Sequence, residues 1–388
     1  MTKSPKRITS PLISRLGELD WDYAGDISQS SFSALHFHPG RFISQIPAAL
    51  IGRLSRQGGT ILDPYCGSGT TLLEAQRLGR ASIGIDINPV SILVTKAKTS
   101  TRRAGRIANI LEGHLEKMLS SRWEMGAKTA SMSFAPPSSV QGEKWYHPAT
   151  LGELTIIWRY IESTRGLSRD LLLFCFSAIL MPACNETRHW GYICDNTRPL
   201  TTRRVDVFSA FETAAQRLIE AYAERDRNLT DNQIVPRADI RCGDAAAVLK
   251  TIADDTVDLV VTSPPYFGVV DYVKAQRLSM EWMGYDIARY RSAETGARSK
   301  RSRQSAHREY LDEVEAVFRE TARVIHRGGH CCIIVGQSMK REDCLEDLER
   351  RICRSGLRLE FKERRSIAIG RRQTPSLKEE VLLVYVKN

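Results

Sequence analysis

The stretch VDLVVTSPPYFG, residues 257–268, sets the organisation of this 388-residue chain. Its first six residues are mostly apolar and β-branched, which predicts a buried strand. The strand must stop at Pro264 and Pro265, because proline has no amide hydrogen to extend a sheet and its φ angle is fixed. Ser263 and Tyr266 add a hydroxyl and a flat ring at the carboxyl end. These four residues could hold a planar base with an exocyclic amino group, or they could form only a strand end and a rigid turn.

A second motif lies upstream, in ILDPYCGSGTTLLEA, residues 61–75. It predicts a strand, a glycine-rich turn and the start of a helix, because Gly67 and Gly69 permit a close backbone approach and Thr70 suits a helix cap. Neither GxGxxG nor a GKS or GKT triplet is present, which argues against a phosphate-binding loop. Asp63 at the strand end would repel a pyrophosphate but suits a sulfonium and an amino group.

Together, the two motifs resemble those of the amino-methylating DNA methyltransferases that use S-adenosylmethionine, DP(F/Y)xGSGTT and (S/D/N)PP(Y/F). The resemblance implies an α/β fold, a doubly wound Rossmann-like sheet of about seven strands with a terminal reversed strand. A helical insertion accompanies it in this chain. The implied reaction moves a methyl group from S-adenosylmethionine to an amino nitrogen of a flipped base in double-stranded DNA. Serine at the first position of SPPY favours N4 of cytosine, and N6 of adenine is the alternative.

The resemblance also implies roles for individual residues. Ser263 Oγ and the Pro264 carbonyl would accept the amino protons, and Tyr266 would stack on the base. No covalent intermediate is needed, so Cys66 is not proposed as a nucleophile. The cofactor would be held by Phe42, Asp63, Tyr65, Gly67, Gly69, Thr70, Asp86 and Asp244.

Three of these cofactor residues have more specific expectations. Asp86 ends the next strand at the interval where doubly wound folds place an acid on ribose hydroxyls, although a strand-end Asp can also cap a helix. Asp244 matches the position that meets the adenine amino group. Phe42 lies in an HPGRF segment that would pack against the cofactor, or it belongs to the core face of an amphipathic helix at 36–59.

The chain divides into an N-terminal arm (1–35), a cofactor-binding half (36–127), a helical insertion (128–235) and a catalytic half (236–388). Strands are expected near residues 60, 83, 240, 260, 333, 362 and 383. Further helices are expected over 269–286 and 310–329. Target recognition by the insertion is a hypothesis, since known members of this class place that region elsewhere.

A net charge of +11 favours a polyanionic partner. Two segments combine cations in a way that suits DNA. The first, within 183–204, could instead be a loop pinned by a buried tryptophan, and the second, 287–310, could be a solvated loop. The candidate DNA contacts are Arg188, Trp190, Arg198, Arg289, Arg291, Arg298, Lys300, Arg301 and Arg303.

Other classes of site and location are disfavoured. His36 and His38 lack a third ligand at a recognisable spacing, so no metal site is expected. The nine cysteines contain no CxxC pair and predict reduced core residues. The N-terminus lacks an apolar run of signal-peptide length, and the apolar stretch 171–183 is too short to span a bilayer. We therefore expect a cytoplasmic, nucleoid-associated prokaryotic enzyme, with a restriction endonuclease as a functional partner.

Two other functions remain open from the sequence. An RNA methyltransferase could use similar motifs, but enzymes that act on guanine of tRNA usually carry DPPY or NPPY and an added RNA-binding domain. A non-catalytic DNA-binding subunit would not be expected to keep Asp63, Asp86, Asp244 and SPPY together.

Overall fold

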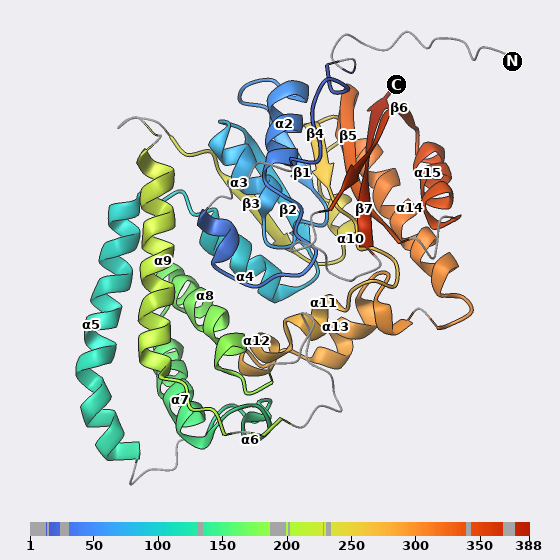
Figure 1. Ribbon diagram of the computed structural model, residues 1–388. Helices are drawn as coiled ribbons and strands as arrows, with labels where there is room; N and C mark the ends of the chain where they lie inside the picture. The colour runs from blue at the N-terminus through green and yellow to red at the C-terminus, as the bar shows by residue number, and fades with distance from the viewer. Residues whose placement is uncertain are drawn as a thin grey trace, which may run out of the picture.

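Seven strands form one mixed sheet in the order β3-β2-β1-β4-β5-β7-β6 in the computed structural model (Figure 1). The structure describes residues 13, 15–23, 31–129, 135–186, 199–200, 202–227, 229, 234–300, 302–338, 343–367 and 377–388. The first five strands of this order are parallel, and β7 runs antiparallel to both β5 and β6. The doubly wound sheet of seven strands with a terminal reversed strand is therefore confirmed.

All seven strands lie where the sequence predicted them. Their bounds are β1 Thr60–Asp63, β2 Ala81–Asp86, β3 Ala238–Cys242, β4 Val257–Thr262, β5 Ile325–Ser338, β6 Leu357–Ser366 and β7 Leu377–Lys387. The motif strands β1 and β4 are direct neighbours, with Ile61 opposite Leu259 and Leu62 opposite Val260. Both motifs therefore end at the same edge of the sheet.

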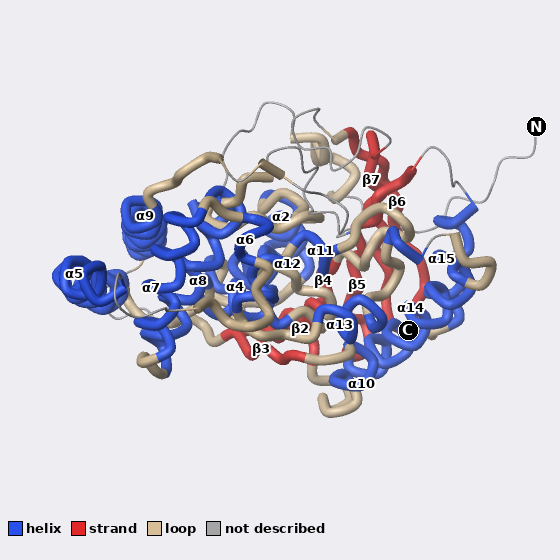
Figure 2. The backbone as a smooth tube through the Cα atoms, turned by 90° about the horizontal axis from the view of Figure 1, so that it is seen from below, coloured by secondary structure: helices blue, strands red, loops and turns tan. Residues whose placement is uncertain are grey.

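Alternate side chains of the strands point to opposite faces of the sheet, as expected for pleated strands that are covered on both sides. On one face, Leu259 and Val261 pack with α2 (Gln45–Leu54) and with Trp21 from the N-terminal segment. On the other, Val260 packs with α14 (Ala306–Val324). Helices α10 (Ala245–Leu249) and α15 (Asp343–Arg354) complete the second layer, as the view from below shows (Figure 2).

A separate group of helices lies beyond the β3 edge of the sheet (Figures 1 and 2). It comprises α5 Ala104–Thr129, α6 Gly142–Trp145, α7 Pro148–Glu162, α8 Gly166–Ala183 and α9 Val207–Arg227. Its apolar core also includes residues of α4 (Pro89–Lys98) and α12 (Arg277–Trp282), which belong to the two halves of the sheet region. The helical region is thus continuous with both halves.

Helix α8 contains the most apolar stretch of the chain. At 18 residues the helix is long and apolar enough, by length and composition alone, to cross a membrane. The sequence analysis considered only residues 171–183, a stretch that is too short. Just over half of the helix, 56%, is buried inside the protein. Leu172, Phe174 and Phe176 are among the fully buried side chains that join it to the other helices.

Several helices differ from the sequence prediction, because polar or glycine-containing segments interrupt the helical pattern. The helix expected from residue 36 begins only at Gln45 as α2, after a 3-10 turn, η1 (Ser31–Ala34), and an irregular segment. The helix expected over 269–286 is divided into α11 (Tyr272–Ala275) and α12. The basic run that follows is ordered into α13 (Ile287–Ala293) and η2 (Arg298–Lys300). The first helix after β1 is α3 (Thr70–Arg77).

Candidate active site

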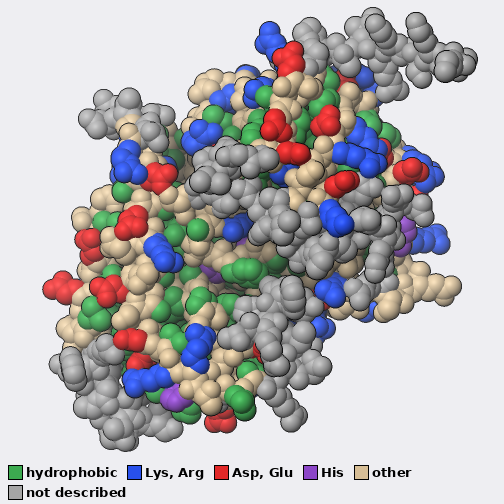
Figure 3. Space-filling model, in the orientation of Figure 1, with side chains coloured by type: hydrophobic (Ala, Val, Ile, Leu, Met, Phe, Trp, Pro, Cys, Tyr) green, Lys and Arg blue, Asp and Glu red, His purple; other side chains and the backbone are tan. Residues whose placement is uncertain are grey.

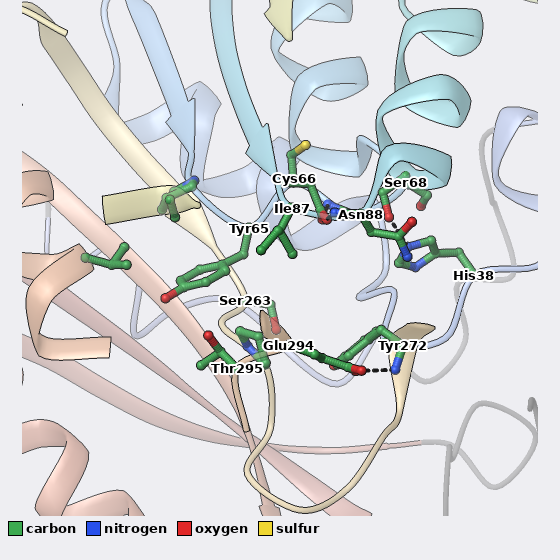
Figure 4. Close-up of a pocket in the computed structure, with 18 of the residues that line it drawn as sticks. His38, Tyr65, Cys66, Ser68, Ile87, Asn88, Ser263, Tyr272, Glu294 and Thr295 are labelled. Atoms are coloured by element: carbon green, nitrogen blue, oxygen red, sulfur yellow. Dashed lines mark hydrogen bonds between the residues drawn. The ribbon is translucent and has the colours of Figure 1, made fainter. Parts of the chain in front are cut away.

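A cavity of about 310 Å³ lies where the carboxyl ends of β1, β2, β3 and β4 meet. Its wall combines residues from both motifs with the segment before α2 and the loop after α13 (Figure 4). The predicted site residues that line it are Phe42, Tyr65, Gly67, Thr70, Asp86, Asp244, Ser263 and Pro265. The edge between β1 and β4 is where the strand order reverses, the usual ligand position in a doubly wound sheet.

The glycine-rich turn has a conformation that demands glycine. Gly67 has φ +49° and Gly69 has φ +80°, in the left-handed region. A Cβ on Gly69 would come within 2.7 Å of the Thr95 side chain. The Gly67 amide donates to Asp86 Oδ2 at 2.9 Å, which ties the turn after β1 to the end of β2. Gly69 does not line the cavity and is instead the N-cap residue that precedes α3.

Asp63 lies beneath the cavity, not in its wall. Its side chain is 1% exposed and accepts hydrogen bonds from Thr262 Oγ1 at 2.7 Å and the Tyr65 amide at 3.1 Å. Burial raises the pKa of the Asp63 carboxyl to about 6, against the lowering effect of these hydrogen bonds. The carboxylate therefore joins the ends of β1 and β4 next to Pro64 and Tyr65, which line the cavity.

Asp86 lies in the cavity wall and does not cap the following helix. The cap of α4 is Asn88, whose Oδ1 accepts from the Val90 amide, while Asp86 accepts from the Asn88 amide at 2.7 Å. Burial raises the pKa of Asp86 to about 6. Asp244 also lines the cavity, and it caps α10 by accepting from the Ala247 amide at 2.8 Å.

The catalytic motif divides between the cavity wall and the core. Ser263 and Pro265 line the cavity, but Pro264 and Tyr266 do not. The Tyr266 side chain is 3% exposed and packs beside Ile367. Its hydroxyl lies 3.1 Å from Ser263 Oγ, so it contacts the proposed catalytic hydroxyl from outside the cavity.

The sequence analysis did not predict several of the residues that line the cavity. Tyr272 and Glu294 come from elements after β4, and Glu294 accepts a hydrogen bond from the Tyr272 amide (Figure 4). Burial raises the pKa of Glu294 to about 8. Glu294 is the single acid before Glu309 in the basic run 287–310, and this isolated acid was a signal that could have marked it. His38 also lines the cavity, and burial lowers its pKa to about 3.

One end of the cavity carries unsatisfied polar groups. Ser68 Oγ and Asn88 Nδ2 are buried and have no hydrogen-bond partner among the described residues. Behind them, the Lys98 ammonium is 1% exposed, with Nζ 3.5 Å from the Ser68 carbonyl. Burial lowers the pKa of Lys98 to about 7. Buried donors without acceptors indicate space for a polar, anion-bearing ligand. Together with the acids, they fit a cofactor that carries a carboxylate, an amino group and ribose hydroxyls.

The basic run after α13 packs against the catalytic loop. The Gly268 amide donates to the Gly296 carbonyl at 2.8 Å, and the Arg298 amide donates to the Val270 carbonyl at 3.1 Å. Lys300 Nζ donates to the carbonyls of Ser292 and Glu294 at 2.6 and 2.7 Å, so its ammonium holds this loop together. The run is therefore a structured wall beside the cavity.

The other candidate DNA contacts differ in exposure. Arg289 and Arg303 are exposed, and Arg291 and Arg298 are half-buried. In the view of Figure 3, lysines and arginines are scattered over the visible face and do not form one patch. The predicted contacts Arg188, Trp190, Arg198 and Arg301 lie outside the described residues.

Histidines and cysteines have structural roles. His36 and His38 each bind the carbonyl of the following residue through Nδ1, and their Nε2 atoms face Ser177 and Ser91. The described residues contain no cluster of three or more potential metal ligands. The cysteines of the described part of the chain are free thiols. Cys66, Cys175, Cys184, Cys331 and Cys332 are buried, as predicted for core residues, but the prediction is wrong for Cys242 and Cys353, which are exposed, and Cys344 is only half-buried.

Comparisons with known proteins agree with this geometry. A family model described as DNA methylase, of the N6 and N4 methyltransferase type, matches residues 21–96. The type II methyltransferase M.MjaII of Methanocaldococcus jannaschii is 21% identical over 400 residues, which cover 82% of this chain and 75% of the relative. The type II methyltransferase M.BsoBI of Geobacillus stearothermophilus is 25% identical over 295 residues, 69% of this chain and 56% of the relative.

A shorter match has a different substrate in its name. The tRNA (guanine(10)-N2)-dimethyltransferase of Methanocaldococcus jannaschii is 37% identical over 54 residues, 14% of this chain and 15% of that protein. The chain thus spans three quarters of the first relative, little more than half of the second and a small part of this one. By its motifs and these matches, the chain is similar to the DNA amino-methyltransferases that use S-adenosylmethionine.

Proposed function

We propose that this protein methylates the exocyclic N4 of a flipped cytosine in duplex DNA, as the modification enzyme of a prokaryotic restriction-modification system in the cytoplasm. The observation that carries the proposal is that one cavity joins Asp86 and Asp244 to Ser263. Acids suited to ribose and adenine therefore lie across a small space from the hydroxyl of the catalytic strand. A methyl donor and a base amine would meet in that space.

The cofactor-binding side of the cavity would work through its own polar groups. Asp86 is the proposed acceptor for ribose hydroxyls, and Asp244 is the proposed acceptor for the adenine amino group. Asp63 supplies negative charge beneath the sulfonium and amino groups, and Ser68 and Asn88 have free donors for a carboxylate. When bound, S-adenosylmethionine supplies an electrophilic methyl group. Phe42, Tyr65 and Thr70 contribute the remaining contacts around it.

The catalytic side must make a poor nucleophile reactive. An amino group on a base ring shares its lone pair with the ring. Hydrogen bonds from its protons to Ser263 Oγ in the cavity wall and to the Pro264 carbonyl would draw the nitrogen toward tetrahedral geometry and localise that lone pair. The Pro264 carbonyl must turn toward the cavity to do so, because Pro264 does not line it in this structure. The base must leave the duplex to reach the cavity, which costs roughly a few kcal/mol. Stacking on an aromatic ring would offset on the order of 1–3 kcal/mol.

Two aromatic rings are candidates for that stacking. Tyr266 is the residue expected from the motif, but its ring would have to leave its buried position to contact the base. Tyr272 already lines the cavity beside Ser263 (Figure 4). Exposed Arg289 and Arg303 are proposed to contact DNA phosphates near the cavity mouth.

The decisive experiment identifies the modified nucleoside. Duplex DNA is incubated with the purified protein and S-adenosylmethionine, digested, and analysed by mass spectrometry for methylated nucleosides. N4-methylcytosine is expected. N6-methyladenine as the sole product would replace the cytosine assignment with the adenine alternative, while leaving the DNA methyltransferase proposal intact.

The RNA alternative is favoured by one observation, the short match to a tRNA methyltransferase. A competition assay with equal amounts of duplex DNA and tRNA separates the two, with methyl transfer to DNA expected. A non-catalytic DNA-binding subunit would show no methyl transfer and no thermal stabilisation by S-adenosylmethionine.

A further inference from the structure

A row of buried polar side chains adjoins the Ser-Pro-Pro-Tyr turn outside the cavity wall. Tyr266 Oη lies 3.1 Å from Ser263 Oγ and 3.1 Å from Glu380 Oε1. Glu380 on β7 forms an ion pair with Arg365, its direct partner on β6. Arg365 Nε also donates to the Trp21 carbonyl at 2.8 Å. Tyr266, Glu380 and Arg365 are only 3–5% exposed, so water has little access to this row.

The protons of this row can be assigned by counting donors. The Glu380 carboxylate, paired with a guanidinium, accepts hydrogen bonds and donates none. The Tyr266 hydroxyl therefore donates its single hydrogen bond to Glu380. Burial, and next the Glu380 charge, raise the pKa of Tyr266 well above its ordinary value, which keeps that proton in place. The phenolic oxygen is then an acceptor toward Ser263.

Ser263 has one hydroxyl proton and two neighbours that can accept it. The Ile334 carbonyl lies 3.0 Å from Ser263 Oγ, and the Tyr266 oxygen lies 3.1 Å away. Neither neighbour lines the cavity. The proton of Ser263 is thus directed away from the cavity, and a lone pair of Oγ is left for a donor inside it. A base amino group is such a donor.

We propose that Glu380 and Arg365, acting through the hydroxyl of Tyr266, are positioning residues that hold Ser263 Oγ as a hydrogen-bond acceptor for the target amino group. The inference rests on the proposed function. It gives two strands at the far edge of the sheet a role in catalysis, and it assigns the hydroxyl of Tyr266 a role that requires the side chain to stay in its buried position. A base with a ring carbonyl at the reacting position would find no donor at Ser263.

Tyr266→Phe tests this role, because it keeps the buried ring and its packing beside Ile367 and removes only the hydroxyl. We expect kcat to fall about tenfold, with the KM for DNA and the affinity for S-adenosylhomocysteine unchanged. Ser263→Ala should lower kcat further, by about 100-fold, in the range found when one catalytic hydrogen-bonding group is removed. Adding Tyr266→Phe to Ser263→Ala should cause no additional loss.

Glu380→Gln gives a second variant of nearly the same shape. The Gln amide can donate to the phenolic oxygen, so the Tyr266 proton turns toward Ser263 and competes with the base for its lone pair. A loss in kcat comparable to that of Tyr266→Phe is expected. Tyr385→Phe is the matched control, since Tyr385 lies on the same strand and its buried hydroxyl has no partner among the described residues. It should retain full activity.

Full activity of both Tyr266→Phe and Glu380→Gln would overturn the inference. So would losses that multiply in the double variant with Ser263→Ala, because they would show that Tyr266 acts independently of Ser263. Failure of the proposed function is a separate result, visible as absence of the methylated nucleoside in the unsubstituted protein.

Discussion

The carboxyl edge of the sheet and the helical region bury charge in opposite ways. In the core that the helical region shares with α12, the buried acid Glu281 pairs with Arg277 at 2.7 Å. At the sheet edge, Asp63 and Asp86 receive their hydrogen bonds from backbone amides and a threonine hydroxyl, and Lys98 contacts a carbonyl. Burying charge without an opposite charge is costly. The difference indicates that this buried acid already has its partner within the protein, whereas the sheet edge is built to receive a charged ligand.

The largest expected effect is a loss of stability from a substitution in the core of the helical region. Trp282 is fully buried, with its ring centroid 5.2 Å from Phe176 and 5.9 Å from Trp158. Trp282→Ala should lower the free energy of unfolding by about 3–5 kcal/mol because it leaves a large cavity. Urea denaturation followed by circular dichroism measures this, and Trp282→Phe, which fills part of the space, should lose less. A loss below about 1 kcal/mol would mean that the helical core is not tightly packed there.

The sheet edge predicts a pH dependence of cofactor binding. Because burial raises the pKa of Asp63 and Asp86 to about 6, both carboxyls take up protons as the pH falls through 6. The protonated forms no longer offer charge to a sulfonium or two acceptors to ribose. The contribution of these two carboxyls to the affinity for S-adenosylmethionine should therefore be constant above pH 7. Below pH 6 the affinity should weaken by up to about tenfold per pH unit for each carboxyl, or about 1.4 kcal/mol.

Isothermal titration calorimetry between pH 5 and 8 measures this dependence. Asp86→Asn should bind more weakly at pH 7 and show a flatter profile, since one titrating group is gone. An affinity that does not change over this range would argue against ionised carboxylates at the cofactor.

The basic wall beside the cavity predicts the smallest effect. Arg289→Ala and Arg303→Ala should each lower the slope of log affinity against log salt for duplex DNA by up to about 0.9, one phosphate contact each. Arg350→Ala on α15, also an exposed arginine, is the control and should leave the slope unchanged. Lys300→Ala should reduce stability rather than the slope, because its ammonium is bound to loop carbonyls. Unchanged slopes for Arg289 and Arg303 would remove them from the DNA interface.

The sequence by itself determined the sheet and the ligand-binding edge, because both depend on local signals. Apolar β-branched runs predict strands, and the residues that end them, such as Asp63, Asp86 and Ser263, must meet where parallel strands end together. The glycine turn and the Pro-Pro pair are equally local, because they restrict the backbone directly. Family resemblance then supplied the cofactor.

Only the tertiary structure decided which side chains face the cavity and which support it. The Tyr266 side chain lies in the core because its hydroxyl donates a hydrogen bond to Glu380, which is 114 residues later in the chain. Glu294 turns inward because the Tyr272 amide and the loop pinned by Lys300 enclose it. Burial, and therefore the pKa of each acid, depends on strands and loops far away in the chain. A local pattern can mark a residue such as Glu294 as unusual, but it does not give its direction or its pKa, because side-chain direction and desolvation are properties of the packed whole.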